Sequence, residues 1–121
     1  MDVSYEDPIS HYFNKKRTAD KVWIEPYFRA YIIKKAIEKA GSLNEVGRVM
    51  GYRSRIHPGW SVRQILMGIR PVAKERLNRL LSYINIPYEE VEKHIVTNNR
   101  YTTSETYLAL KQYGFLYYLS K

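Results

Sequence analysis

The side chains that most often carry out catalysis are few in this chain and far apart. Cysteine is absent, so no disulfide, thiol nucleophile or cysteine-bound metal can form. The histidines His11, His57 and His94 are scattered, and no acid or second histidine has motif spacing with them. The acids Glu89 and Glu90 are explained by a helix start, where the helix dipole favours negative charge. No phosphate-loop, dinucleotide-binding or zinc-protease motif is present, so we expect no enzyme, no metal and no cofactor.

Positive charge is concentrated in the middle of the 121-residue chain, whose net charge is +8. Residues 21–60 contain eight basic and three acidic side chains, and residues 61–86 contain five and one, so this region carries +9. Residues 1–20 carry −1 and residues 87–121 carry no net charge. A basic block within a well-patterned region indicates a polyanionic partner. The alternative is a generally basic surface that keeps the protein soluble by repulsion.

Helices account for most of the predicted structure. Pro26 suits the first position of a helix that Gly41 ends, and Ser42 and Glu45 have the spacing of a capping box at the start of the next helix. We expect helices at about 26–40, 43–50, 62–67, 71–84 and 88–95, with Ser61 capping the third and Pro71 opening the fourth. A further helix would run from Thr103 or Ser104 to about Gln112. The predicted fold is mainly α, a compact bundle of about five short helices with a C-terminal segment of uncertain structure.

The order and spacing of these elements resemble one known family. Residues about 29 to 91 resemble the lambda-repressor-like helix-turn-helix domain, also called the Xre or Cro type. The matching positions are Ile33, Ile37, Ser42, Leu43, Val46, Met50, Gly51, Val62, Ile65, Gly68, Arg70, Pro71, Leu77, Leu80, Leu81, Ile86 and Val91. The resemblance implies duplex DNA binding by a homodimer, with the helix after Trp60 in the major groove. The stretch 51–68 is about five residues longer than the family pattern. Either the loop is enlarged and contacts phosphates itself, or the third helix is displaced.

The resemblance also suggests which side chains would contact DNA. The predicted base contacts are Ser61, Arg63 and Gln64, because arginine can bond guanine and glutamine can bond adenine in a bidentate manner. The predicted backbone contacts are Ser42, Asn44, Arg53, Ser54, Arg55, His57, Arg70 and Lys74. The alternative for Arg63 and Gln64 is the solvent side of a short helix. Trp60 and Tyr52 could stack on a base, but we expect Trp60, beside a turn, to anchor the loop to the core.

These observations divide the chain into an N-terminal arm at 1–25, a helix-turn-helix domain at 26–95 and a C-terminal extension at 96–121. The basic cluster at 14–17 is either a groove-binding arm or a solvated loop. The aromatic extension is a candidate dimer surface or core segment. We expect a cytoplasmic, nucleoid-associated transcription regulator without a membrane span or a small-molecule substrate. The alternative function is a non-catalytic interaction module whose basic face binds RNA or an acidic protein.

Overall fold

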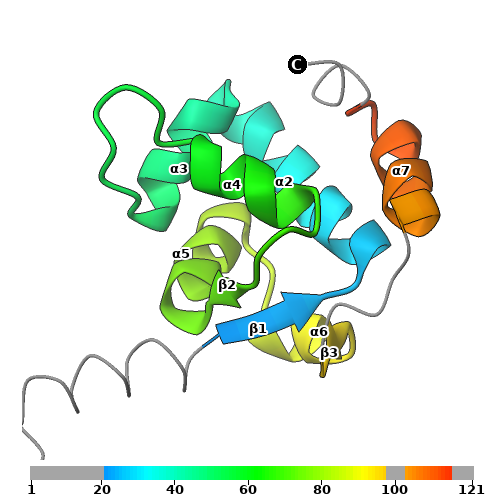
Figure 1. Ribbon diagram of the computed structural model, residues 1–121. Helices are drawn as coiled ribbons and strands as arrows, with labels where there is room; N and C mark the ends of the chain where they lie inside the picture. Colours follow the sequence, from blue (N-terminus) through cyan, green and yellow to red (C-terminus); the bar gives the residue numbers. More distant parts are fainter. Residues whose placement is uncertain (1–20, 98–102, 116–121) are drawn as a thin grey trace, which may run out of the picture.

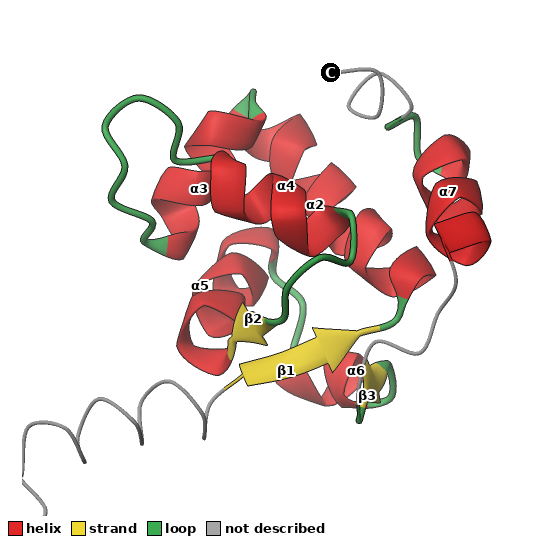
Figure 2. Ribbon diagram, viewed as in Figure 1, coloured by secondary structure: helices red, strands yellow, loops and turns green. Residues whose placement is uncertain are grey.

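Six helices and a small sheet make up the part of the chain that the structure, a computed structural model, describes: residues 21–97 and 103–115 (Figure 1, Figure 2). The helices are α2 (Pro26–Ala40), α3 (Leu43–Met50), α4 (Trp60–Leu66), α5 (Lys74–Ile84), α6 (Tyr88–Glu92) and α7 (Thr103–Gln112). The strands are β1 (Lys21–Ile24), β2 (Val72–Ala73) and β3 (Ile95–Val96). The predicted mainly α fold class is therefore confirmed.

The strands form a three-stranded antiparallel sheet in the order β2-β1-β3. Val22 pairs with Val72, and Ile24 pairs with Ile95. The sheet therefore joins β1 to β2, which comes just before α5, and to β3, which follows α6. Sequence patterns did not predict it. Strand β1 lies in the stretch assigned to the arm, while residues 14–17 lie outside the described residues. The predicted fourth and fifth helices were too long, because Pro71 precedes β2 rather than a helix, and because α6 ends before β3 begins.

The end of α2 and the start of α3 lie at the predicted residues. Helix α2 begins at Pro26, and Gly41 ends it in the left-handed region with φ 102°, where a side chain would be strained. Ser42 Oγ accepts a hydrogen bond from the amide of Glu45 at 3.1 Å, which confirms the predicted cap. In a full capping box the Glu45 carboxylate would also accept from the Ser42 amide. Here that carboxylate pairs with Arg48, one turn later.

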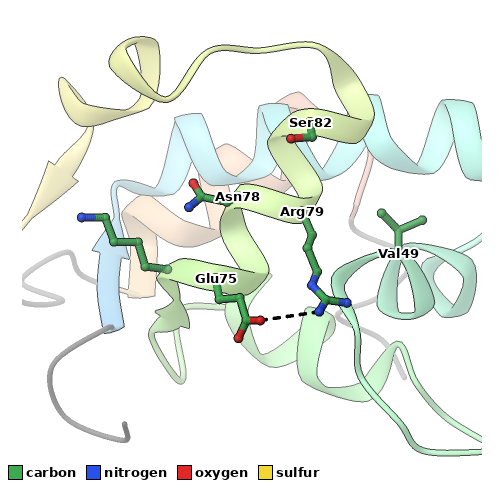
Figure 3. A pocket seen from close by; sticks show the side chains of 6 residues that line it. Val49, Glu75, Asn78, Arg79 and Ser82 are labelled. Carbon is green, nitrogen blue, oxygen red and sulfur yellow. Dashed lines mark ion pairs between the residues drawn. The ribbon is translucent and has the colours of Figure 1, made fainter. Parts of the chain in front are cut away.

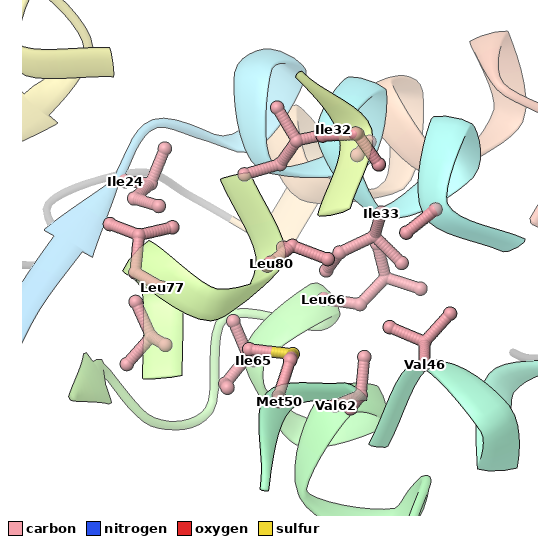
Figure 4. Close-up of a cluster of buried hydrophobic side chains, with 14 of the residues drawn as sticks. Ile24, Ile32, Ile33, Val46, Met50, Val62, Ile65, Leu66, Leu77 and Leu80 are labelled. Carbon is pink, nitrogen blue, oxygen red and sulfur yellow. The ribbon is translucent and has the colours of Figure 1, made fainter. Parts of the chain in front are cut away.

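Apolar faces of α2, α3, α4 and α5 meet in one core (Figure 4). The predicted stripe on α5 is buried at Leu77, Leu80, Leu81 and Ile84. Figure 4 shows Leu77 and Leu80 against the following buried residues of the other helices: Ile32, Ile33, Val46, Met50, Val62, Ile65 and Leu66. The segment after β3 contributes as well, because α7 packs along α2 and buries Ala109, Leu110 and Phe115. The described part of the C-terminal extension thus belongs to the core, and residues 116–121 lie outside the described chain.

Arg29 is a buried charged side chain in the middle of this arrangement, with only 2% of its surface exposed. Its guanidinium donates to the carbonyl oxygen of Leu66 at 3.2 Å, to that of Ile24 at 2.9 Å and to Thr106 Oγ1 at 3.1 Å. A buried charge is tolerated only when hydrogen bonds replace its lost water. Arg29 therefore connects the end of α4, the end of β1 and helix α7.

Candidate nucleic-acid interface

The loop before α4 returns along α3 instead of turning tightly away from it. Residues 51–59 separate the two helices. A Cβ added to Gly47 would lie 2.1 Å from the carbonyl oxygen of Pro58, and one added to Gly59 would lie 2.8 Å from the carbonyl carbon of Leu43. Asn44 Oδ1 also accepts a hydrogen bond from the Gly59 amide at 2.9 Å. Helix α4 therefore begins beside the start of α3, and two glycines permit the close backbone crossing.

Helix α4 runs from this crossing to the start of α2, where the carbonyl of Leu66 accepts from Arg29. Its inner face buries Val62, Ile65 and Leu66. The helix begins at Trp60, so the prediction that Ser61 caps it is wrong, and Gly59 occupies the cap position. The additional residues of the loop thus carry the chain back along α3 and leave α4 with one face buried and one face outward.

Two of the three predicted base contacts lie together on the outward face of α4. Arg70 Nη1 donates to Ser61 Oγ at 3.2 Å and to Gln64 Oε1 at 3.3 Å. Arg63 is half-buried on the same helix. Trp60 does not anchor the loop to the core as predicted, because 55% of its surface is exposed at the start of α4. The outward face therefore combines an exposed indole with a half-buried amide, hydroxyl and guanidinium network.

Four of the predicted backbone contacts make hydrogen bonds that shape the loop and α3. Ser42 Oγ accepts from Glu45, as described above, and the Asn44 side chain holds Gly59. Ser54 Oγ accepts from the amide of His57 at 3.1 Å within the loop. The hydroxyl proton of Ser54 and the imidazole of His57, both on exposed residues, are not used in this bond. These residues therefore have a structural role in α3 and the loop, apart from any contact with DNA.

The predicted basic contacts separate into three places, of which the first is the network on α4 that contains Arg70. Arg53 and Arg55 are exposed in the loop. Lys74, at the start of α5, instead has its Nζ 5.2 Å from the centre of the Tyr88 ring of α6. The structure therefore does not group Lys74 with the network on α4.

Arginines from three segments line one polar cleft of about 670 Å³ between the end of α3, the following loop and α5. The lining residues are Arg48, Gly51, Tyr52, Arg53, Ser54, Glu75, Arg76 and Arg79. We call this the arginine cleft. Only Arg53 and Ser54 of these belong to the predicted site. The sequence alone does not reveal that Arg76 and Arg79 meet Arg48 and Arg53, because this convergence depends on tertiary packing.

Tyr52 joins the arginine cleft to the network on α4. The guanidinium carbon of Arg76 lies 4.3 Å from the centre of the Tyr52 ring. Burial raises the pKa of the Tyr52 hydroxyl, and the positive charges of Arg76 and Arg70 partly offset that rise. Arg70 thus acts on Tyr52 electrostatically and bonds Ser61 and Gln64 directly. Tyr52 therefore lies close to both polar groups.

The acids near the cleft neutralise only part of its charge. Glu75 Oε2 lies 3.5 Å from Arg79 Nη2, with both side chains more than half exposed, and Figure 3 shows this pair on the outer side of α5, next to Val49. The pair between Glu45 and Arg48 is also exposed. Such surface pairs stabilise a fold weakly and exchange readily with other anions. The cleft therefore keeps an excess of positive charge.

Comparisons with known proteins found no matching family model, no matching curated protein and no matching solved structure. Among the helices of residues 21–97 and 103–115, none has both the length and the apolar composition of a membrane span.

Proposed function

We propose that the chain binds double-stranded DNA as a small transcription regulator, with the outward face of α4 toward the bases. One observation carries the proposal: Arg70 bonds the polar face of α4 and lies near enough to Tyr52, a residue that lines the arginine cleft, to act on its hydroxyl electrostatically. Base readout requires hydrogen-bonding side chains on an element that enters a groove. Phosphate binding requires basic side chains beside it. Both requirements are met by these two neighbouring polar groups.

The Arg70 bond gives Gln64 a defined role in the proposed readout. The Gln64 oxygen faces Arg70, so its amide nitrogen is left to donate to an acceptor on a base edge. Arg63, on the same helix, would donate to guanine. Arg53 and Arg55 in the exposed loop would contact the phosphate backbone. This division assigns sequence preference to α4 and general affinity to the loop and cleft.

The test is fluorescence anisotropy with a random-sequence duplex over a salt series, followed by the same measurement on a duplex selected for tight binding. The logarithm of affinity should fall with the logarithm of salt concentration by about 0.9 per phosphate neutralised. Gln64→Ala should reduce binding to the selected duplex by about 1–3 kcal/mol while changing random-duplex binding little. Equal losses on the two duplexes would contradict base readout by α4, and no duplex binding at low salt would refute the proposal.

The exposure of Trp60 favours one alternative, the binding of single-stranded RNA. An exposed indole beside basic side chains can stack on an unpaired base. Competition between an RNA single strand and the duplex separates the two functions. RNA that displaces the duplex in wild type but not in Trp60→Ala would support the alternative.

Homodimer formation is a second part of the proposal. Exposed large side chains on α2 and α7 offer a surface for it: Tyr27, Tyr31, Tyr107 and Leu108. A dimer would place two copies of α4 on two half-sites of one duplex. Sedimentation equilibrium of the free protein and of its DNA complex measures the stoichiometry.

A further inference from the structure

We propose that the arginine cleft is a binding site for phosphate groups. The proposal names a site outside the residues predicted to read bases, with a ligand class of its own. A phosphate could come from the backbone of DNA, in which case the inference rests on the proposed function, or from a free oligophosphate, in which case it does not. The chemistry of recognition is the same for both sources.

The charges that line the cleft favour a multiply charged anion. Four guanidinium groups and one carboxylate line it, which leaves three positive charges in excess, or two when the Glu45 carboxylate that pairs with Arg48 is also counted. The lining carboxylate, Glu75, pairs with Arg79 at 3.5 Å in an exposed position. A guanidinium presents parallel N–H donors that match the oxygens of a phosphate. A phosphate group with two or three negative charges would therefore balance the cleft better than a single carboxylate.

Two of the guanidiniums converge on one point of the backbone. The Nη1 atoms of Arg79 and Arg76 lie 2.8 Å and 3.1 Å from the place where a Cβ on Gly51 would sit. Like charges repel when they are brought together, and an anion between them removes that repulsion. Gly51 is in the left-handed region with φ 93°, so glycine both permits this turn and leaves room for the two side chains.

Two backbone amides of the cleft are already bonded within the fold, so side chains supply much of its donor capacity. The amide of Gly51 donates to the carbonyl of Arg48 at 3.0 Å, and the amide of Tyr52 donates to that of Gly47 at 2.9 Å. The Ser54 hydroxyl accepts from His57 and retains its own proton for donation. Guanidinium groups and this hydroxyl are therefore among the donors that the cleft offers.

The competing explanation is that these arginines serve only the fold. It holds in part for Arg76, which donates to the carbonyl of Met50 at 3.3 Å and lies on the ring of Tyr52. It does not extend to Arg53, which is exposed in the loop, or to Arg79, whose ion pair within the described part of the chain is with exposed Glu75. These two arginines can be replaced with little expected effect on stability, so they are the ones to test.

The experiment compares Arg53→Gln/Arg79→Gln with Lys93→Gln/Lys111→Gln, a control with the same charge change on exposed residues outside the cleft. Inorganic tripolyphosphate binding is measured by calorimetry at fixed ionic strength, and random-duplex binding by anisotropy over a salt series. We expect the cleft variant to lose about tenfold or more in tripolyphosphate affinity, because each charged hydrogen bond contributes that much. The control should lose less than about twofold. Far-UV circular dichroism checks folding, and the single loop variant Arg53→Glu serves if the double variant does not fold.

The two phosphate sources give different results. If the cleft holds a DNA phosphate, the plot of log duplex affinity against log salt concentration becomes less steep in the cleft variant. The magnitude of its slope decreases by about 1 to 2, and that of the control decreases less. If it holds a free oligophosphate, only tripolyphosphate binding is lost. Loss of tripolyphosphate binding in a protein that binds no duplex would support the cleft while refuting the proposed DNA function. Equal tripolyphosphate affinities for the cleft variant and the control, with equal duplex slopes, would overturn the inference, as would a wild-type protein that binds neither probe.

Discussion

Replacement of Arg29 by methionine tests whether the buried guanidinium holds the fold together. Methionine fills a similar volume without a donor. The change removes hydrogen bonds to the carbonyls of Leu66 and Ile24 and to Thr106 Oγ1. These three acceptors belong to α4, β1 and α7, which are far apart in the sequence. The loss should therefore lower the free energy of global unfolding and not only that of one segment.

The magnitude follows from two opposing effects. Each buried carbonyl that loses its donor costs about 1–3 kcal/mol, and the two carbonyls are the larger part of the loss. Against this, the methionine side chain avoids the desolvation penalty that the guanidinium incurs in the core. We expect Arg29→Met to lower the free energy of unfolding by about 2–4 kcal/mol. For a domain of this size each 1 kcal/mol lowers the Tm by about 4–8 °C, so the Tm should fall by on the order of 10–25 °C.

The assay is urea unfolding followed by far-UV circular dichroism, with Arg48→Met as the matched control. Arg48 is exposed and pairs only with Glu45 among the ion pairs of the described residues, so its replacement should change stability by no more than about 0.5 kcal/mol. Arg29→Lys, which keeps the charge but loses the branched donor group, should lie between wild type and Arg29→Met. An Arg29→Met protein within about 0.5 kcal/mol of wild type would refute the reasoning, because the three bonds would then contribute nothing net.

Three further changes probe the loop, the cap and the buried tyrosine. Ser42→Ala removes the acceptor for the Glu45 amide and should cost about 1 kcal/mol in urea unfolding, whereas Ser42→Asp should restore most of it. Gly47→Ala should destabilise the fold by about 1–3 kcal/mol in the same assay, although alanine favours helices, because its Cβ would lie 2.1 Å from the Pro58 carbonyl oxygen; a stabilised variant would contradict the close crossing. Burial raises the pKa of Tyr52 above its ordinary value of 10.0, so the folded chain holds that proton more tightly than the unfolded chain does. The stability that this proton contributes is complete below pH 10.0 and is lost as the pH rises through the folded-state pKa. Tyr52→Phe should therefore lose less stability than wild type at alkaline pH. Urea midpoints of both proteins, measured on both sides of pH 10.0, test this.

Local signals predicted the helices well where the sequence carries their boundaries. Pro26 and Gly41 bound α2, and the Ser42 cap begins α3 at the expected residue. The predicted C-terminal helix coincides with α7, including its stop near Gly114, whose φ is 79°. Each of these features depends on a few neighbouring residues, which is why sequence alone reveals it.

Features that depend on distant residues escaped prediction. Strand β1 has only four residues and exists because Val22 and Ile24 pair with partners about 50 and 70 positions later. The arginine cleft gathers side chains from α3, the loop and α5, and no single segment shows it. Arg29 sits on the apolar face of α2, and helical spacing does not reveal that it bonds Leu66 and Thr106, which are 37 and 77 positions later in the chain. One informative signal was present: glycine at position 47, inside a helix, indicates a close backbone approach.

The long loop explains why the network on α4 and the arginine cleft lie near each other. Its first residues, Tyr52 to Ser54, line the cleft, and its last residues, Pro58 and Gly59, lie on α3 where α4 begins. A direct turn from α3 into α4 could not satisfy both positions, because the start of α4 is fixed by Asn44 at the opposite end of α3. The buried Arg29 then fixes the other end of α4 through Leu66. The outward face of α4 is thus held at both ends by the fold, while the basic side chains beside it remain on exposed or half-buried positions.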